Sequence, residues 1–293
     1  MAGNETPARG AAGTTLDPAT TGDTVAGPAA AGHFTTMQVR GGRVQGFDLH
    51  LSRLCMASRE LYGTTPGASG IRARVHEALL GAGMEEGDCT LRVRVVPVEP
   101  SAVELVEPDE PCRSGYSRDR DTTIAAIAAP TVAVDIEAPR ALGASPLRLQ
   151  TLRALRGSPH LKHLALAPQL HARDAARAAG FDDALLLTPE GHVAEGSFWN
   201  IALWDGSAVT WPEAPILDGV TQRLLQAALR DAGVPQRHAP VPQDGLSAMR
   251  AAFALNSRGV QDVASVDGHV FEGDARFGAL LRELLAACPW QRP

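Results

Sequence analysis

The stretch SPHLKHLALA, residues 158–167, contains Lys162, the only lysine among the 27 lysine and arginine residues of the chain. A GC-rich coding bias would make lysine rare in any case, and a lone lysine is usually a solvated surface charge. This one, however, lies in an apolar run. A lysine amine gives up its proton readily when buried, whereas a guanidinium stays charged. Because covalent chemistry through an amine needs the neutral form, Lys162 is a candidate catalytic residue.

The sequence on the C-terminal side of the lysine alternates helix and strand signals. Pro168 suits the first turn of a helix, so a helix is expected from about residue 167 to Ala179, ended by Gly180. Lys162 then precedes this helix at a strand-to-helix junction. Further strands are expected at DALLLT (183–188), GHVAEG (191–196), FWNIALW (198–204) and AVTW (208–211), and further helices at VTQRLLQAALRDAG (220–233) and ARFGALLRELLAA (275–287).

The sequence on the N-terminal side predicts a smaller unit. A hairpin around Gly41-Gly42 is expected within 34–47, helices at 48–63 and 70–83, and strands at 89–98, 122–129 and 131–136. The segment EAPRALGASPL (137–147) has no strong periodicity and is interpreted as the interdomain connection. We therefore expect an α+β protein with a small N-terminal α/β domain (32–140) and a larger C-terminal domain that carries the lysine (141–293).

Composition narrows the class of protein. Residues 1–31 are rich in Gly, Ala, Thr and Pro and lack large apolar side chains, so they are expected to be a disordered tail. A net charge of -6 argues against a nucleic-acid or anionic membrane surface, and no apolar run is long enough to span a bilayer. The four cysteines are far apart, as in a reduced, cytoplasmic protein. His160 and His163 flank the lysine without a third ligand, so no metal site is expected.

Four fragments carry a family resemblance through their order and spacing. They are HLSRL (50–54), AEGSFWNIALW (194–204), APILDGVTQRLL (214–225) and ALNSRGV (254–260). Together with the lysine they resemble the class IV aminotransferases, the fold-type IV pyridoxal-phosphate (PLP) enzymes, over residues 33–275. That group includes D-amino-acid and branched-chain aminotransferases and aminodeoxychorismate lyase. The resemblance implies a two-domain fold like that of D-amino-acid aminotransferase, a PLP cofactor and a homodimer.

The resemblance also implies roles for individual residues. Lys162 would form the Schiff base with PLP and then move a proton between the substrate α-carbon and cofactor C4′. Glu195 would lie beside the pyridine nitrogen and keep the ring protonated, with Asn200 as a supporting hydrogen-bonding group. The phosphate would be held by Arg53, Gly219, Val220, Thr221 and Ser257, the glycine and its two neighbours forming a helix N-terminus that suits a dianion.

Each of these residues also has a plain structural interpretation. Glu195 could be an exposed turn residue, Arg53 a helix-surface arginine, Ser257 a turn serine, and Gly219 merely a helix cap. Strand alternation favours a different environment for Glu195, because it shares a face with Val193 and is therefore expected to be buried with a partner.

The substrate side departs from the family. Phe34 stands where the D-amino-acid and branched-chain enzymes have a tyrosine, Thr35 replaces an acid, and the region of Ala167 lacks the tyrosine that branched-chain enzymes carry after the lysine. Because a lost hydroxyl removes a specific hydrogen bond, the amino-acceptor preference is not carried over. His33, Phe34 and Arg94 are the residues expected on the substrate side.

The function expected from the sequence is transfer of an amino group between an amino donor and a 2-oxo acid through the Lys162 Schiff base. An elimination like that of aminodeoxychorismate lyase would use the same cofactor residues and is the alternative. A PLP-binding pseudoenzyme with a regulatory role is the third interpretation.

Overall fold

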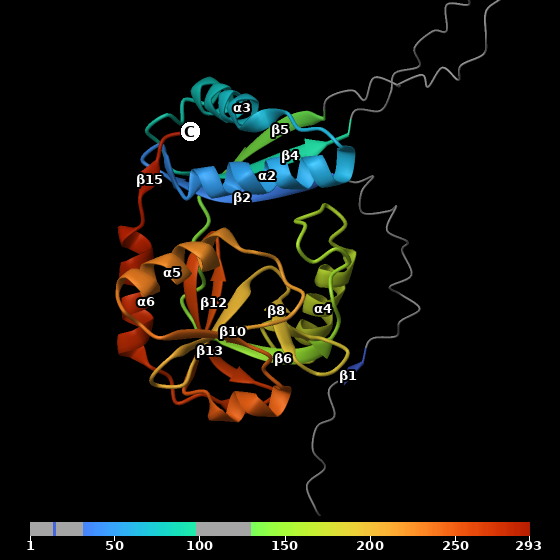
Figure 1. The fold of residues 1–293 in the computed structure, drawn as a ribbon, viewed down its shortest axis with the longest axis vertical. Coiled ribbons are helices and arrows are strands. Elements are labelled where there is room, and N and C mark those ends of the chain that lie inside the picture. Colours follow the sequence, from blue (N-terminus) through green and yellow to red (C-terminus); the bar gives the residue numbers. More distant parts are fainter. Residues whose placement is uncertain (1–13, 16–31, 98–129) are drawn as a thin grey trace, which may run out of the picture.

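The computed structural model describes residues 14–15, 32–97 and 130–293 (Figure 1). The predicted tail therefore lies outside the described residues except for Thr14–Thr15, which form the short strand β1. The strand predicted at 122–129 also lies outside them. Within the described residues, no helix combines the length and apolar character needed to cross a membrane.

The smaller of two sheets is built mainly from the N-terminal third of the chain. Its strands run in the order β15-β3-β2-β4-β5 and all pair antiparallel. They are β2 (His33–Arg40), β3 (Arg43–Gln45), β4 (Cys89–Val96), β5 (Thr131–Glu137) and β15 (Trp290–Gln291), accompanied by the helices α2 (Phe47–Tyr62) and α3 (Gly67–Gly81). The predicted Gly41-Gly42 hairpin and both predicted helices are confirmed.

The two faces of this sheet have different partners because side chains alternate along β2 and β4. On one face, Met37, Val39 and Leu91 join the core with residues of α2 and α3 such as Leu54 and Ile71. The opposite face of the sheet is more polar and faces the larger sheet, where it forms one wall of a cavity. Strand alternation thus leaves polar side chains free to line a site between the two sheets.

The larger sheet has ten strands, eight of them in the order β11-β10-β9-β12-β13-β6-β7-β8, with β1 added to β6 and β14 to β13. Its strands are β6 (Leu147–Arg153), β7 (Asp183–Leu187), β8 (Val193–Gly196), β9 (Asn200–Trp204), β10 (Val209–Pro212), β11 (Gln236–Ala239), β12 (Ala251–Asn256), β13 (Gly259–Val266) and β14 (His269–Val270). The helices are α4 (Ala167–Ala178), α5 (Val220–Asp231) and α6 (Ala275–Ala287), with a 3-10 turn η2 (Gln243–Ala248).

Apolar side chains from many of these strands meet in one core, which includes Leu149, Leu185, Ile201 and Val263. The last strand of the order, β8, returns toward β9 through a 2.8 Å hydrogen bond from the Gly196 amide to the Trp199 carbonyl. The sheet therefore curls around its core, and the polar ends of β8, β9 and β12 open toward the smaller sheet (Figure 1).

The helix predicted after the lysine is confirmed as α4, with Pro168 in its first turn and Gly180 in the left-handed region at φ 88°. The predicted strands β7 to β10 and helices α5 and α6 are confirmed as well. Strands β6 and β11 to β15 were not predicted. In β12, AAFALN, five of the six residues are buried, so the strand has no polar alternation by which its sequence could be recognised.

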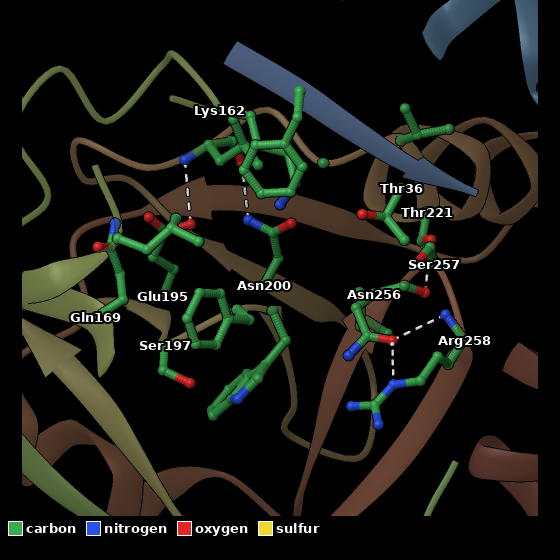
Figure 2. Close-up of a pocket in the computed structure, with 18 of the residues that line it drawn as sticks. Thr36, Lys162, Gln169, Glu195, Ser197, Asn200, Thr221, Asn256, Ser257 and Arg258 are labelled. Carbon is green, nitrogen blue, oxygen red and sulfur yellow. Dashed lines mark hydrogen bonds between the residues drawn. The ribbon is translucent and has the colours of Figure 1, made fainter. Parts of the chain in front are cut away.

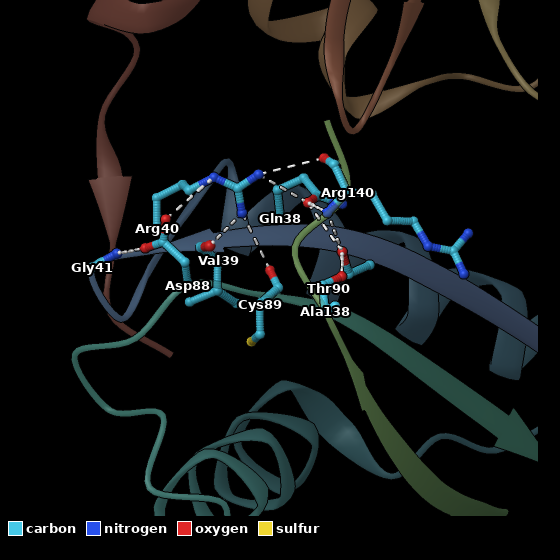
Figure 3. Close-up of polar contacts among 9 residues, drawn as sticks. All are labelled: Gln38, Val39, Arg40, Gly41, Asp88, Cys89, Thr90, Ala138 and Arg140. Atoms are coloured by element: carbon cyan, nitrogen blue, oxygen red, sulfur yellow. Dashed lines mark hydrogen bonds and ion pairs between the residues drawn. The ribbon is translucent and has the colours of Figure 1, made fainter. Parts of the chain in front are cut away.

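The chain passes from the smaller to the larger sheet through residues 138–146, close to the predicted division at 140–141. Figure 3 shows how the start of this connection is held: the Arg140 amide donates to Gln38 Oε1 and Thr90 Oγ1, both at 3.1 Å, and Thr90 Oγ1 donates to the Ala138 carbonyl. The C-terminal end of the chain returns to the smaller sheet, where Trp290 of β15 pairs with Gln45 of β3. The last residues of the predicted C-terminal domain therefore belong to the smaller sheet.

Candidate active site

A cavity of about 450 Å³ lies between the two sheets (Figure 2). The smaller sheet and its helix α2 contribute Phe34, Thr36, Gln38, His50, Arg53 and Arg92 to its lining, and the larger unit contributes residues from the lysine segment, α4, β8, β9, the start of α5 and the end of β12. Of the predicted site residues, Phe34, Arg53, Lys162, Glu195, Asn200, Gly219, Val220, Thr221 and Ser257 all line it.

Lys162 lies between β6 and α4, as predicted, on a segment that pairs with the start of β2. The Phe34 amide donates to the Lys162 carbonyl at 2.8 Å, and the Leu164 amide donates to the Gly32 carbonyl at 2.9 Å. The Lys162 Nζ lies 4.9 Å from the centroid of the Phe34 ring. The backbone of the smaller sheet therefore fixes where the lysine segment enters the cavity.

The environment of the amine favours its neutral form. Burial, followed by the charges of Arg53 and Arg156, lowers the pKa of Lys162 to about 7, while the carboxylate of Glu195 acts in the opposite direction. A pKa lowered from 10.5 to about 7 raises the neutral fraction near pH 7 by roughly three orders of magnitude. Lys162 thus has the reactive form that nucleophilic and acid–base chemistry require.

Glu195 is buried with a charged partner, which confirms the environment predicted from strand alternation. Its side chain is on β8 and the residue is 4% exposed. Its Oε1 lies 3.5 Å from Arg156 Nη1, and its Oε2 accepts a 3.1 Å hydrogen bond from the Leu217 amide. Burial raises the pKa of Glu195, whereas Arg156, the Leu217 amide and Lys162 lower it.

Asn200 holds the segment that leads into α5. Its Nδ2 donates to the Leu217 carbonyl at 2.8 Å, so Glu195 and Asn200 together bond both polar groups of one peptide residue (Figure 2). Two residues later, a Cβ on Gly219 would lie 2.0 Å from Asn200 Oδ1. Only glycine fits there, and its absence of a side chain brings the helix start against β9.

The N-terminus of α5 opens into the cavity. Gly219 is its cap, no side chain in the described part of the chain caps the helix, and Thr221 Oγ1 donates at 2.8 Å to the carbonyl of Asn256, next to Ser257. Free backbone amides and the helix dipole make such an end a binding site for anions. Thr221 and Ser257 lie close together at this end of the cavity (Figure 2).

Arg53 reaches the same cavity from α2. Its Nη2 donates to Thr35 Oγ1 and lies 3.4 Å from His50 Nδ1, while among the described residues its buried Nε has no hydrogen-bond partner. Burial lowers the pKa of Arg53 to about 10 despite the nearby carboxylate of Asp218. A buried guanidinium with an unused donor is suited to an anion such as a phosphate group.

The three residues predicted on the substrate side are placed differently from one another. Phe34 lines the cavity, but His33 does not: its ring accepts or donates a 2.9 Å hydrogen bond with Ser58 Oγ and stacks on Tyr62. Arg94 is also absent from the lining. It forms a bidentate ion pair with Asp135, with hydrogen bonds of 2.8 and 3.0 Å.

Several lining residues had no recognisable signal in the sequence. They are Arg92, Arg140, Arg156, Gln169, Arg173 and Arg258. Arginine is the common cation of this chain, so a single arginine is not distinctive. Alternation along β4 predicts that Arg92 and Arg94 share a face. It does not predict which of the two lies over the cavity, because that depends on where along the strand the larger sheet packs.

The site residues fit a cofactor that has an aldehyde, a basic ring nitrogen and a phosphate. An amine whose pKa is lowered to about 7, a buried carboxylate and a helix N-terminus beside an arginine with an unused donor among the described residues all face one cavity. By contrast, the described residues contain no group of three or more His, Cys, Asp or Glu that could bind a metal ion.

The chain matches known proteins both in sequence and in fold. The family model for amino-transferase class IV matches residues 32–266. A Synechocystis protein provisionally described as a branched-chain-amino-acid aminotransferase is 25% identical over 119 residues, which span 40% of this chain and only 39% of that relative.

Two solved structures share the fold. A Legionella pneumophila protein provisionally described as a 4-amino-4-deoxychorismate lyase has a TM-score of 0.72 at 20% identity, covering 89% of this chain and 92% of that chain. A hypothetical aminotransferase from Mycobacterium tuberculosis, in its PLP-bound form, has a TM-score of 0.69 at 21% identity, covering 91% and 92%. The predicted α+β fold of two-domain, fold-type IV enzymes is thereby confirmed.

Proposed function

Because the chain belongs to the class IV aminotransferase family, we propose that it is a PLP-dependent aminotransferase that moves an amino group between an amino donor and a 2-oxo acid. One observation carries the proposal. The single lysine of the chain, with its pKa lowered to about 7, lines the same cavity as a buried carboxylate and an uncapped helix N-terminus.

The lining residues divide according to the parts of the cofactor. Lys162 would hold the aldehyde carbon covalently, and Glu195 would hold the ring nitrogen. The phosphate would be bound by Arg53, Ser257 and the α5 start at Gly219, Val220 and Thr221. When bound, PLP supplies an electron sink for the electron pair left after a proton departs from the substrate α-carbon.

The residues of this chain perform the remaining work. The Lys162 amine would remove the proton from the substrate α-carbon and deliver it to cofactor C4′. A group that titrates near neutral pH is well suited to both steps. Glu195 supplies a fixed negative charge, and Asn200 keeps the segment before α5 in place through the Leu217 carbonyl. Fixed, preorganised groups of this kind need not rearrange during the reaction.

The cavity wall formed by the smaller sheet is suited to substrates that carry a carboxylate. Arg92 forms no salt bridge with any described residue, its Nε is buried without a partner, and its guanidinium lies 5.4 Å from the centroid of the Phe34 ring. Lys162 Nζ faces the same ring at 4.9 Å. We assign Arg92 to binding a carboxylate of the 2-oxo acid.

Replacing Arg92 by leucine is expected to raise the KM for the 2-oxo acid by roughly 10- to 100-fold, with a smaller effect on kcat. A hydrogen bond to a charged group contributes about 1.5–3 kcal/mol, which accounts for that range. Steady-state kinetics with the acceptor varied would measure it. The matched control is Arg94→Leu, two residues along the same strand but paired with Asp135, and its KM should stay near that of wild type. Equal effects of the two substitutions would contradict the assignment.

The proposed function is tested first by cofactor binding. PLP added to the purified protein should give a visible absorbance band that borohydride reduces, with the label on Lys162 by mass spectrometry. A panel of L- and D-amino donors with 2-oxoglutarate or pyruvate should then yield amine transfer and the pyridoxamine form of the cofactor. A protein that takes up no PLP would refute the proposal.

A lyase reaction is the second candidate, supported by the shared fold of the Legionella protein. It would use the same cofactor residues and differ in the substrate. Release of 4-aminobenzoate from aminodeoxychorismate, without amine transfer in the donor panel, would favour the lyase. Bound PLP with neither reaction would favour a pseudoenzyme.

A further inference from the structure

Arg156 is a buried cation that no motif identified, and it lies between the two residues on which the proposed chemistry depends. It is six residues before Lys162, on the same segment between β6 and α4, and is 8% exposed. Arginine is almost never buried unless its charge is paired. The role of its guanidinium should therefore be visible in its contacts.

Those contacts come from three different elements. Nη1 lies 3.5 Å from Glu195 Oε1 on β8, and Nη2 donates to the carbonyl of Leu161, the residue directly before Lys162. Nε faces the amide oxygen of Gln169 on α4 at 2.7 Å, with that amide turned so that its oxygen points to the arginine. Gln169 is itself 1% exposed. The planar fork of the guanidinium is thus used on three sides.

From this arrangement we propose that Arg156 is a positioning residue that keeps Glu195 ionised for the cofactor ring nitrogen and ties it to the lysine segment. The inference rests on the proposed function, since it concerns how Glu195 meets PLP. Arg156 itself contacts neither reacting atom in this proposal and acts through the carboxylate and the Leu161 carbonyl.

The electrostatic part of the proposal follows from the burial of Glu195. A carboxylate removed from water is protonated more easily, and burial raises the pKa of Glu195 accordingly. Two charged groups lower the pKa of Glu195 against this effect of burial: Arg156, which has the larger effect, and Lys162. The Leu217 amide also donates a hydrogen bond to the Glu195 carboxylate. Because Lys162 is half neutral near pH 7, Arg156 is the permanent counter-charge.

The geometric part explains why an arginine is required. A lysine at position 156 would keep a positive charge but offers a single ammonium centre, which cannot satisfy the Gln169 oxygen, the Leu161 carbonyl and Glu195 in one plane. We therefore expect Arg156→Lys to retain part of the electrostatic effect and to lose part of the positioning.

The test is the pH dependence of PLP affinity, followed by equilibrium dialysis of the cofactor-free Lys162→Ala variant from pH 5 to pH 9. The lysine is removed because Arg156 also lowers its pKa and would otherwise move the acid limb through the amine. In this background, affinity should fall on the acid side as Glu195 becomes protonated. Arg156→Met should move that fall to higher pH by about one to three units, the range by which an adjacent opposite charge shifts a carboxyl pKa. Arg156→Lys should move it less. Arg153→Met is the matched control and should leave the acid limb in place, because its exposed side chain bonds, among the described residues, only the Pro189 carbonyl.

A double variant ties the shift to the carboxylate. When Glu195→Gln is added to the Lys162→Ala background, there is no carboxyl group to protonate and no lysine amine to titrate, so adding Arg156→Met should produce no further movement of the acid limb. If Arg156→Met does not fold, as judged by its melting curve, Gln169→Leu removes one anchor of the guanidinium and should shift the acid limb in the same direction by less.

The outcomes separate this inference from the proposed function. A wild-type protein that binds no PLP at any pH refutes the function. If wild type binds PLP and, in the Lys162→Ala background, Arg156→Met weakens binding equally at all pH values or does not change it, the function stands and the role of Arg156 is refuted. A shift of similar size in the Glu195→Gln background would also refute it.

Discussion

Replacing Lys162 by alanine is expected to lower amine transfer by roughly 10⁴-fold, the upper end of what one positioned acid–base group supplies. The variant loses both the covalent attachment point and the group that moves the α-proton, and no second lysine exists in the chain to take over. The measurement is single-turnover conversion of the cofactor with a saturating amino donor. PLP should still bind without covalent attachment, held through its phosphate.

Lys162→Arg is the sharper companion variant. It keeps a positive charge at the position, yet a guanidinium stays protonated at any pH the protein tolerates, so it should be as inactive as the alanine variant. A rate within tenfold of wild type in either variant would remove Lys162 from the proposed mechanism.

The lowered pKa of Lys162 also predicts how PLP capture and protein stability change with pH. The folded protein holds that pKa at about 7, so the rate at which cofactor-free protein captures PLP should rise through pH 7 and level off above it. The unfolded chain keeps the ordinary value of 10.5 and therefore holds a proton that the folded chain has lost between pH 7 and 10.5. Over that window the contribution of Lys162 to stability increases with pH, and Lys162→Ala should abolish this increase in denaturant titrations.

Glu195→Gln is expected to lower kcat by roughly 10²- to 10³-fold, the range found when one preorganised electrostatic partner is removed. The glutamine has nearly the same shape but no charge to keep the cofactor ring protonated. It also leaves Arg156 buried without its carboxylate, which should lower the free energy of unfolding by about 3 kcal/mol. Kinetics and chemical denaturation would measure the two effects separately.

The matched control is Glu190→Gln, an exposed residue of the turn that precedes the same strand. It should leave both kcat and stability near the wild-type values. If Glu195→Gln keeps more than a tenth of wild-type turnover, the assignment of Glu195 to the ring nitrogen is wrong.

Local patterns predicted a large part of the fold. Pro168 and Gly180 bracket α4, and the Gly41-Gly42 pair turns the first hairpin, because these residues restrict or permit backbone angles whatever surrounds them. Strand β12 escaped because it lies between β9 and β13 and is almost wholly buried. A short run of small and apolar residues acquires its identity as a strand from its neighbours, which the sequence alone does not place.

The site shows the same division. Lys162 was recognised as a candidate because it is a rare side chain in an apolar context, and Glu195 because its fragment resembles that of the class IV aminotransferases and strand alternation favours its burial. Arg156 and Arg92 were missed because an arginine is informative only through its partners, and those partners come from other elements. The contrast between Arg92 and Arg94 illustrates this: the two share a face of β4, and Asp135 lies opposite Arg92 on the neighbouring strand, yet its carboxylate forms its ion pair with Arg94.

The two backbone hydrogen bonds between the start of the smaller sheet and the lysine segment would also make the proposed cofactor attachment depend on the whole chain. Phe34 lies in β2 of the smaller sheet and Gly32 directly precedes that strand, whereas Lys162 and Leu164 follow a strand of the larger sheet. The arginines that lower the lysine pKa come from both sides too, Arg53 from α2 and Arg156 from the lysine segment. A chain in which only one sheet has formed would expose an ordinary, protonated lysine. On the proposed function, capture of the cofactor aldehyde would therefore report that both halves have assembled, because the amine would become reactive only in the completed molecule.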